Sequence, residues 1–312
     1  MKKIVAIHDI AGLGRVSLGT VLPILSAMGA QVCPLPTSVL SSGTSGFSDF
    51  YFQDLTQAME GTLRHWESLS LQVDAVYSGF LGSPGQVELV LRCAKSCLRQ
   101  NGLFIVDPVM GDNGEIEPTM DKEMVAKMKE LVGHAGCITP NLTEAALLLD
   151  EAYPTAHIHN GVPMGMLQNW LVRLCDLGPE IAIITSVPLT SVVIGEESAE
   201  DAKSREMAVI AYDRKGNDFL LVPYAPLPLE FPGSGDAFAS VMAGALAYAM
   251  PLPESLCLAV DVILLAMEET IGGQMLPREG MVLGDAMNLL ARARRSRRAG
   301  FTDTSRSRCI LL

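Results

Sequence analysis

The feature that most restricts the fold of this chain is an alternation of short apolar runs with longer helical patterns between residues 4 and 185. Ile4–Ile7 and Asp74–Tyr77 have the length of buried strands, and apolar residues at helical spacing follow them, as in Val16–Met28. Strands that alternate with helices in this way form parallel βαβ units. The pattern therefore predicts an α/β fold whose sheet is covered by helices on both faces.

The pattern changes in the C-terminal half. Three apolar runs, Ser191–Ile194, Met207–Tyr212 and Phe219–Val222, are joined by polar connections and predict antiparallel hairpins. Because no internal repeat or linker interrupts the chain, we expect one domain over residues 1–294, followed by a basic, flexible tail over residues 295–312. Further helices are expected over Asp236–Ala249, Glu254–Glu268 and Gly284–Arg294.

Composition narrows the class of protein. The net charge of −12 argues against a nucleic-acid partner. No apolar run reaches the roughly 20 residues of a membrane-spanning helix. The 7 cysteines are odd in number and scattered, mostly through apolar segments, which favours free, buried thiols. We therefore expect a cytoplasmic protein that binds neither membrane nor nucleic acid.

Polar clusters follow the strand-like runs at five places. They begin at His8-Asp9, Ser78-Gly79-Phe80, Asp107-Pro108, Thr139-Pro140-Asn141 and Thr185-Ser186. Each cluster alone is ordinary loop chemistry. Ligands of open parallel sheets bind at the carboxyl ends of the strands, however, so the recurrence predicts a binding site along that edge.

The stretch Gly233-Ser234-Gly235-Asp236 adds a sixth cluster. Its glycines permit a tight turn, and a helical pattern begins directly after it. The first amides of a helix have no internal partner and lie at the positive end of its dipole, so they bind anions. Asp236 is either a capping residue or a carboxylate that accepts a proton during phosphoryl transfer, and the stretch alone leaves both interpretations open.

Four residues could supply magnesium ligands. Asp107, Asp112, Asn141 and Glu144 carry the hard oxygens that Mg²⁺ prefers. Asn141 and Glu144 are three residues apart at a predicted helix start and could serve one site. A capping role for Asn141 or Thr143 is equally consistent with the pattern.

Other site classes have little support. Gly12-Leu13-Gly14 lies where a dinucleotide fingerprint would begin, but Ser17 occupies the position of its third glycine. The chain contains no Gly-Lys-Ser/Thr phosphate loop, and its 5 histidines show neither metal-ligand nor triad spacing. A Rossmann cofactor site, a P-loop kinase and a hydrolase are therefore disfavoured.

Taken together, the motifs resemble the vitamin kinases of the ribokinase-like superfamily, from about residue 3 to residue 290. Gly233-Ser234-Gly235-Asp236 resembles the superfamily's Gly-Thr/Ser/Ala-Gly-Asp signature. Two further segments, residues 106–112 and 138–144, resemble motifs of the vitamin-kinase branch. Residues 78–83 resemble the corresponding segment of the pyridoxal kinases, and residues 7–15 resemble that of the bacterial pyridoxamine kinases. The resemblance implies a three-layer α/β/α sandwich. Its central sheet would be mostly parallel, with antiparallel edge strands near the C-terminal half.

The resemblance also implies an activity. The protein would phosphorylate the 5′-hydroxymethyl group of pyridoxal, pyridoxamine or pyridoxine in vitamin B6 salvage, with ATP and Mg²⁺, as a cytoplasmic homodimer. Whether a monovalent cation assists is left open. Asp236 would be the base for the primary alcohol, and the amides of Gly233, Ser234, Gly235 and Asp236 would hold the transferring phosphoryl group.

The remaining roles are implied in the same way. Asp9, Thr44, Phe80 and His8 would lie at the substrate ring. Asp107 and Glu144 would organise Mg²⁺, with Asn141 at the ATP phosphates and Thr185 and Ser186 toward the nucleotide.

Three departures from the resembling motifs leave the vitamer open. Phe80 stands in place of the usual Tyr, Ser41-Ser42-Gly43-Thr44 lacks the usual His, and His8 replaces a small residue. Hydroxymethylpyrimidine (phosphate) kinase of thiamine synthesis is the alternative activity. A non-catalytic vitamer-binding protein is a second alternative, against which the intact Gly233–Asp236 stretch argues.

Overall fold

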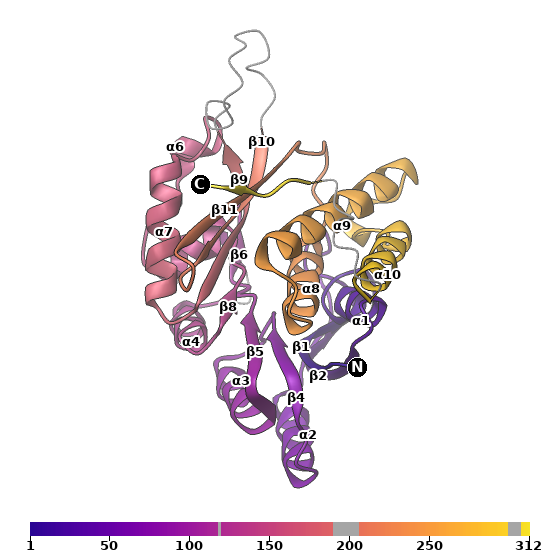
Figure 1. The fold of residues 1–312 in the computed structure, drawn as a ribbon. Helices are drawn as coiled ribbons and strands as arrows, with labels where there is room; N and C mark the ends of the chain where they lie inside the picture. Colours follow the sequence, from indigo (N-terminus) through magenta and orange to yellow (C-terminus); the bar gives the residue numbers. More distant parts are fainter. Residues whose placement is uncertain (118–119, 190–205, 299–306) are drawn as a thin grey trace. The chain divides into compact units, whose positions relative to one another are not determined.

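The structure is a computed structural model that describes residues 1–117, 120–189, 206–298 and 307–312 (Figure 1). Its internal contacts divide the chain into two compact units. The first comprises Met1–Asp107 and Leu229–Arg306, and the second comprises Pro108–Pro228 and Ser307–Leu312. The single domain expected from the sequence stays a prediction, and the two units are described separately.

The first unit contains a five-stranded sheet in the order β3-β2-β1-β4-β5. Its parallel pairs are β1 with β2, β1 with β4, and β4 with β5, and β3 runs antiparallel to β2 at the edge. The strands are β1 (Lys3–Ala11), β2 (Gln31–Leu40), β3 (Phe52–Asp54), β4 (Val73–Ser78) and β5 (Leu98–Val106).

Helices pack on this sheet in two groups. α1 and α8 contact each other and the strands, with α9 and α10 packed beyond them, whereas α2 and α3 form a separate pair (Figure 1). The bounds are α1 (Leu18–Ala27), α2 (Thr56–Ser68), α3 (Pro84–Cys97), α8 (Ser234–Ala247), α9 (Leu252–Gly272) and α10 (Gly284–Arg298), with a 3₁₀ turn η2 (Pro277–Glu279).

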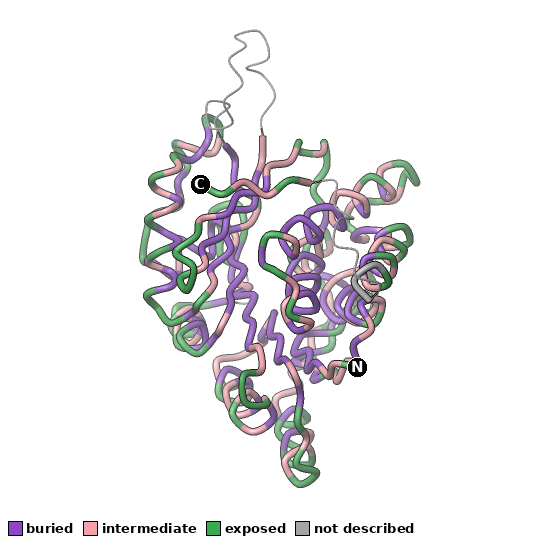
Figure 2. Tube along the Cα trace, viewed as in Figure 1, coloured by how far each residue is buried: buried purple, intermediate pink, exposed green. Residues whose placement is uncertain are grey.

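Cover on both faces explains the composition of the central strands. Ile4, Val5, Ala6 and Ile7 of β1 are all fully buried, because parallel strands between helix layers bury every side chain (Figure 2). The uninterrupted apolar runs seen in the sequence are the result.

The second unit has a sheet in the order β8-β9-β10-β11-β12 and a small hairpin of β6 and β7. β8 and β9 are parallel, and the remaining pairs are antiparallel, which confirms the hairpin predicted over Met207–Tyr212 and Phe219–Val222. The strand expected over Ser191–Ile194 lies outside the described residues. The bounds are β6 (Gly111–Asp112), β7 (Glu115–Ile116), α4 (Lys122–Val132), β8 (Cys137–Ile138), α5 (Leu142–Leu149), α6 (Thr155–Ile158), α7 (Met164–Asp176), β9 (Ile181–Leu189), β10 (Glu206–Asp213), β11 (Asp218–Tyr224) and β12 (Ile310–Leu311).

β2 is longer than its sequence indicates. The apolar run Gln31–Leu35 predicts a short strand, and the Ser/Gly/Thr-rich stretch over residues 37–48 predicts a loop. Instead β2 continues to Leu40 and pairs with β1 beyond a register shift, with Ala11 opposite Leu40. Thr37 and Ser38 are buried, so strand pairing with β1 outweighs their local preference for a turn.

Parts of the expected tail have regular structure. Helix α10 continues to Arg298 instead of ending near Arg294, and Ile310 and Leu311 pair with β11. Residues 299–306 lie outside the described residues. Antiparallel pairing gives the apolar end of the chain a partner that its sequence does not reveal.

The structure can be compared with two predictions, one about the cysteines and one about membrane-spanning helices. All seven cysteines are free, as predicted, and five are buried, whereas Cys33 and Cys309 are half-buried. Within the described residues, no helix combines the length and the apolar character that crossing a membrane requires.

Candidate active site

Helix α8 begins at a turn that only glycine accommodates. Gly233 has φ 82°, and a Cβ at this position would lie 2.5 Å from the carbonyl oxygen of Arg15. The chain therefore closes tightly before Ser234, the first residue of α8. Amides in the first turn of a helix lack partners within the helix, which is the basis of the anion-binding prediction for Gly235 and Asp236. The Ser234 amide donates to the Phe231 carbonyl at 3.3 Å.

The Asp236 carboxylate is held from β1 and α1. Its Oδ2 accepts a 2.7 Å hydrogen bond from the Ser17 amide, and its Oδ1 lies 3.7 Å from Nδ1 of His8. Burial raises the pKa of Asp236, and the Ser17 amide partly opposes that rise. The Asp236 side chain keeps 14% of its surface exposed.

His8 lies beneath Asp236 with no exposed surface, and neither ring nitrogen has a hydrogen-bond partner. Burial lowers its pKa to about 3, so the imidazole is neutral. The ring packs edge-on against Tyr77 at 4.4 Å between centroids, and a Cβ at Gly79 would lie 2.2 Å from its Cε1. The expected contact of His8 with a substrate ring stays a prediction.

Asp9 is also buried, at the end of β1. Burial is the main cause that raises its pKa to about 7, and the nearby Asp236 charge adds to the rise. A side-chain hydrogen bond from Ser17 acts in the opposite direction. The two carboxylates of this site therefore influence each other's ionisation.

Replacement of Asp9 by asparagine tests this environment. The pKa of Asp9 rises from 3.8 to about 7 on folding, so its stabilising contribution is complete below pH 3.8 and lost as the pH rises through 7. Asp9→Asn lacks this dependence. Its free energy of unfolding, relative to wild type, should therefore increase between about pH 4 and 7, by at most about 1.4 kcal/mol per pH unit.

Urea unfolding at several pH values measures this difference in the free energy of unfolding. Buried, neutral His8 makes both proteins more stable as the pH rises, so its contribution cancels in the difference. Exposed Asp49→Asn is the matched control. A difference that stays flat with pH would contradict the buried environment of Asp9.

Asp107 ends β5 and faces the same turn. Its amide donates to the Ser78 carbonyl at 2.8 Å, and its Oδ2 lies 4.0 Å from the position of a Cβ on Gly235. Burial, together with the charges of Asp107 and Asp236, raises the pKa of Tyr77 well above its ordinary value. The predicted meeting of Asp107 with the Gly233–Asp236 turn is thus present within the first unit.

Thr44 and Phe80, the other predicted ring contacts, are half-buried at the carboxyl ends of β2 and β4. The Phe80 carbonyl accepts a 3.1 Å hydrogen bond from Thr37 Oγ1. Next to Thr44, the Gly43 amide donates to Leu13 at 2.9 Å, which joins the loops after β1 and β2.

In the second unit, Asn141 and Glu144 form a capping box at the start of α5. Asn141 Oδ1 accepts from the Glu144 amide at 2.9 Å, and Glu144 Oε2 accepts from the Asn141 amide at 2.8 Å. Glu144 Oε1 also accepts from the Met110 amide at 3.2 Å. The capping alternative is therefore confirmed, and a metal-binding role for the pair stays a prediction.

Thr185 lies beside Asn141 through an isolated bridge, and its amide donates to the Pro140 carbonyl at 3.0 Å. Ser186 is exposed, with φ 54°. Among the described residues, no three His, Cys, Asp or Glu side chains are grouped as a metal site.

Comparison with known proteins identifies the family of this chain. The model of the phosphomethylpyrimidine kinase family matches residues 24–277, which is most of the chain. The chain belongs to this family. The resemblance stated from the motifs is thereby confirmed.

The family's solved structures share the whole fold. A Bacteroides thetaiotaomicron protein provisionally named a phosphomethylpyrimidine kinase is 39% identical, with a TM-score of 0.87 over 100% of this chain and 98% of its own. A second crystal form of that protein, with pyridoxal, gives a TM-score of 0.86. Pyridoxal kinase from Lactobacillus plantarum is 28% identical over 95% of this chain and 99% of its own, with a TM-score of 0.81. These neighbours confirm the predicted ribokinase-like α/β fold.

A curated relative matches over a shorter span. Pyridoxal kinase from Rubrobacter xylanophilus is 29% identical over 205 residues, which are 63% of this chain and 62% of the relative. The match thus covers a little under two thirds of that relative's length.

Two residues that hold the parts of the candidate site in place were not identified from the sequence. Ser17 holds Asp236 through its amide, and Gln86 is fully buried on α3. Gln86 accepts from the Gly82 amide at 2.8 Å and donates to the Thr37 carbonyl at 2.9 Å, so it fixes the loop after Phe80. A lone Gln on the apolar face of a predicted helix was the available signal.

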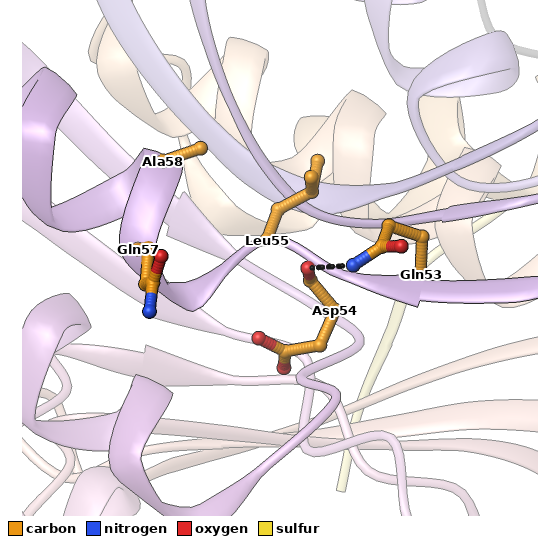
Figure 3. Close-up of a pocket in the computed structure, with 5 residues that line it drawn as sticks. All are labelled: Gln53, Asp54, Leu55, Gln57 and Ala58. Atoms are coloured by element: carbon orange, nitrogen blue, oxygen red, sulfur yellow. Dashed lines mark hydrogen bonds between the residues drawn. The ribbon is translucent and has the colours of Figure 1, made fainter.

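A pocket in the first unit lies at the junction of β3 and α2, and no predicted site residue lines it (Figure 3). Its lining is Gln53, Asp54, Leu55, Gln57 and Ala58. The Asp54 carboxylate accepts from Gln86 Nε2 at 3.0 Å, which ties the pocket wall to the Gln86 network. The carboxylates of Asp9, Asp107 and Asp236 lie elsewhere in this unit, near the turn before α8.

Proposed function

We propose that the protein transfers the γ-phosphoryl group of ATP to the 5′-hydroxymethyl group of a vitamin B6 vitamer. The observation that carries the proposal is the partly exposed Asp236 side chain in the first turn of α8, where helix amides lack partners within the helix. The 39% identical Bacteroides protein crystallised with pyridoxal supports the substrate class.

We assign a role to each part of the turn. Phosphoryl transfer needs positioning and charge neutralisation more than covalent chemistry, because its transition state is loose. The first-turn amides around Gly235 would hold the transferring group. Asp236 would orient the alcohol and accept its proton, and burial raises its pKa, which makes it a stronger proton acceptor.

Mg²⁺ would neutralise charge on the ATP phosphates. Asp107 fits this task, since it presents a hard oxygen toward the start of α8. Glu144 remains the second proposed ligand, with Asn141, Thr185 and Ser186 toward the nucleotide. If the metal is required, a chelator should abolish turnover, and added Mg²⁺ should restore it.

Glu144→Gln separates the capping role of Glu144 from a metal role. Both carboxylate oxygens accept from backbone amides, and a glutamine NH₂ would place a donor against one of those amides. We expect a loss of about 1–3 kcal/mol in the free energy of unfolding, measured in urea. Glu123→Gln removes an exposed first-turn charge from α4 and is the matched control.

The dependence of turnover on Mg²⁺ completes this experiment. A purely capping Glu144 predicts the same half-saturating Mg²⁺ concentration in the folded variant as in wild type. A metal ligand predicts a higher one. Unchanged stability in Glu144→Gln would contradict the capping box.

Hydroxymethylpyrimidine kinase is the second candidate activity, favoured by the family model over residues 24–277. A panel of pyridoxal, pyridoxamine, pyridoxine and hydroxymethylpyrimidine with Mg-ATP distinguishes the two by kcat/KM. The proposal expects a B6 vitamer to have the highest value. Preference for the pyrimidine would replace it, and binding without turnover would favour the vitamer-binding alternative. Cytoplasmic location and a homodimeric state are further parts of the proposal, and sedimentation would test the latter.

A further inference from the structure

The buried face of α3 includes a polar side chain, Gln86, which has no exposed surface. Burial of an amide costs free energy unless hydrogen bonds within the protein replace those that the amide makes with water. An apolar residue such as the neighbouring Val87 or Val90 fills a buried helix position without that cost. A glutamine at this position therefore points to a task for its amide.

Hydrogen bonds occupy both ends of the Gln86 amide. Its Oε1 accepts from the Gly82 amide at 2.8 Å. Its Nε2 donates to the Thr37 carbonyl at 2.9 Å, to Asp54 Oδ2 at 3.0 Å and to Thr56 Oγ1 at 3.1 Å. Because a backbone N–H only donates and a carbonyl only accepts, the orientation of the amide is fixed. Gln86 thus joins β2, the junction of β3 with α2, and the loop after β4.

That loop carries Phe80, one of the predicted ring contacts. At its start the Gly79 amide donates to a carbonyl of β1 at 3.0 Å, and at its end Gly82 donates to Gln86. Between them the Phe80 carbonyl accepts from Thr37 Oγ1 at 3.1 Å. Thr37 therefore links Phe80 to Gln86, because its hydroxyl bonds to one and its carbonyl to the other.

The other partners of this link are fixed as well. A Cβ at Gly82 would lie 3.1 Å from Cζ of Phe52 on β3, so the loop packs closely against that strand. Asp54, which accepts from Gln86, also accepts from the Thr56 amide at 2.8 Å through its Oδ1. Movement of the loop would therefore require several hydrogen bonds to break together.

We propose that Gln86 is a positioning residue that fixes the loop Gly79–Gly82 and thereby sets the place of the Phe80 ring at the substrate site. The inference rests on the proposed function, because it deepens the role of Phe80 there. Asp236 is held separately, by the Ser17 amide at 2.7 Å. Loss of the Gln86 hydrogen bonds should therefore weaken binding of the aromatic alcohol far more than it slows the transfer step.

Gln86→Met tests this role, because methionine has a similar length and makes none of these hydrogen bonds. We expect KM for pyridoxal to rise roughly tenfold, the effect of about one hydrogen bond. Both kcat and KM for ATP should change little. Steady-state kinetics with pyridoxal and Mg-ATP measure the three quantities. Gln57→Met is the matched control, since Gln57 is exposed in the first turn of α2, and it should leave all three unchanged.

Thr37→Val tests the second half of the link. Valine keeps the branched shape and the carbonyl that accepts from Gln86, but it loses the hydroxyl that donates to Phe80. KM for pyridoxal should rise again. Because both residues hold one loop, the double variant should show less than the product of the two single effects. Thr20→Val is the control, since Thr20 Oγ1 is a buried hydroxyl with no hydrogen-bond partner among the described residues.

Hydrogen exchange of the Gly82 amide measures the loop without any substrate. NMR of the full chain should show exchange roughly tenfold faster in Gln86→Met than in wild type, because the amide loses its acceptor. Gln57→Met should exchange at the wild-type rate. This measurement does not depend on kinase activity.

The outcomes distinguish this inference from the proposed function. Unchanged Gly82 exchange in folded Gln86→Met overturns the inference, whatever the activity. Faster exchange with an unchanged KM for pyridoxal, or with a fall in kcat as large as the rise in KM, overturns it too, because Gln86 would then not act through the substrate site. If thermal unfolding shows that Gln86→Met is not folded, an unchanged KM for pyridoxal in Thr37→Val overturns it. A wild type without activity on any B6 vitamer ends the proposed function, while the exchange still tests whether Gln86 holds the loop.

Discussion

Replacement of Asp236 by asparagine is expected to lower kcat by roughly 10²–10⁴-fold, the usual contribution of a general base. Asparagine keeps an oxygen for the Ser17 amide, which donates at 2.7 Å, but it cannot accept the proton of the alcohol. The turn before α8 should stay in place, so ATP affinity should change little. Steady-state kinetics and calorimetric titration with ATP measure the two quantities, and Asp236→Ala should lose turnover at least as completely.

Glu254→Gln controls for the loss of a negative charge in a first helical turn, because Glu254 holds the same position in α9. This variant should keep wild-type turnover. Near-normal kcat in Asp236→Asn would remove Asp236 from the catalytic role. Loss of ATP affinity in proportion to kcat would instead assign the residue to the phosphate site.

Replacement of Gly233 by alanine is expected to cause the largest loss of stability. The added Cβ would lie 2.5 Å from the Arg15 carbonyl oxygen, and the φ of 82° is disfavoured for any residue with a Cβ. The Arg15 backbone cannot easily retreat, because its amide is bonded to Glu279. We expect a loss of about 1–3 kcal/mol or more in urea unfolding, as for overpacked cores.

The same variant should lose activity, since relief of the clash moves the amides that would bind the phosphoryl group. Gly61→Ala is the matched control, because nothing lies within 4 Å of its Cβ in the interior of α2. It should stabilise the protein by roughly 0.5–1 kcal/mol. A Gly233→Ala variant as stable as wild type would show that the turn before α8 is looser than the structure indicates.

Prediction from the sequence succeeded where the signal is local or periodic. The alternation of strands and helices specified the parallel sheet of the first unit, and the apolar runs near residues 207 and 219 specified an antiparallel hairpin. The glycines around Ser234 specified the start of α8. Prediction from the sequence failed at the end of β2. Thr37 and Ser38 have the polar character of loop residues, and only the pairing of β2 with β1 explains why they are buried in a strand.

Two features of the site became visible only in the structure. Asn141 and Glu144 have the spacing of both a capping box and a ligand pair, and the capping hydrogen bonds alone are visible in the fold. The full burial of His8 beside Asp236 is also visible only in the fold, and its expected contact with a substrate ring stays a prediction. Spacing along the chain specifies which residues share a helix turn, but not which atoms remain open to a ligand.

The sequence by itself determined the α/β class, the family and the turn at which an anion would bind, because these depend on periodicity and on residues adjacent in the chain. Only the tertiary structure decided what surrounds Asp236. Ser17, which donates to it, is 219 residues away in the chain, and its positive φ has no signature in residue identity. Packing of α1, β1 and α8 brings these groups together, and that packing determines the burial that raises the pKa of Asp236.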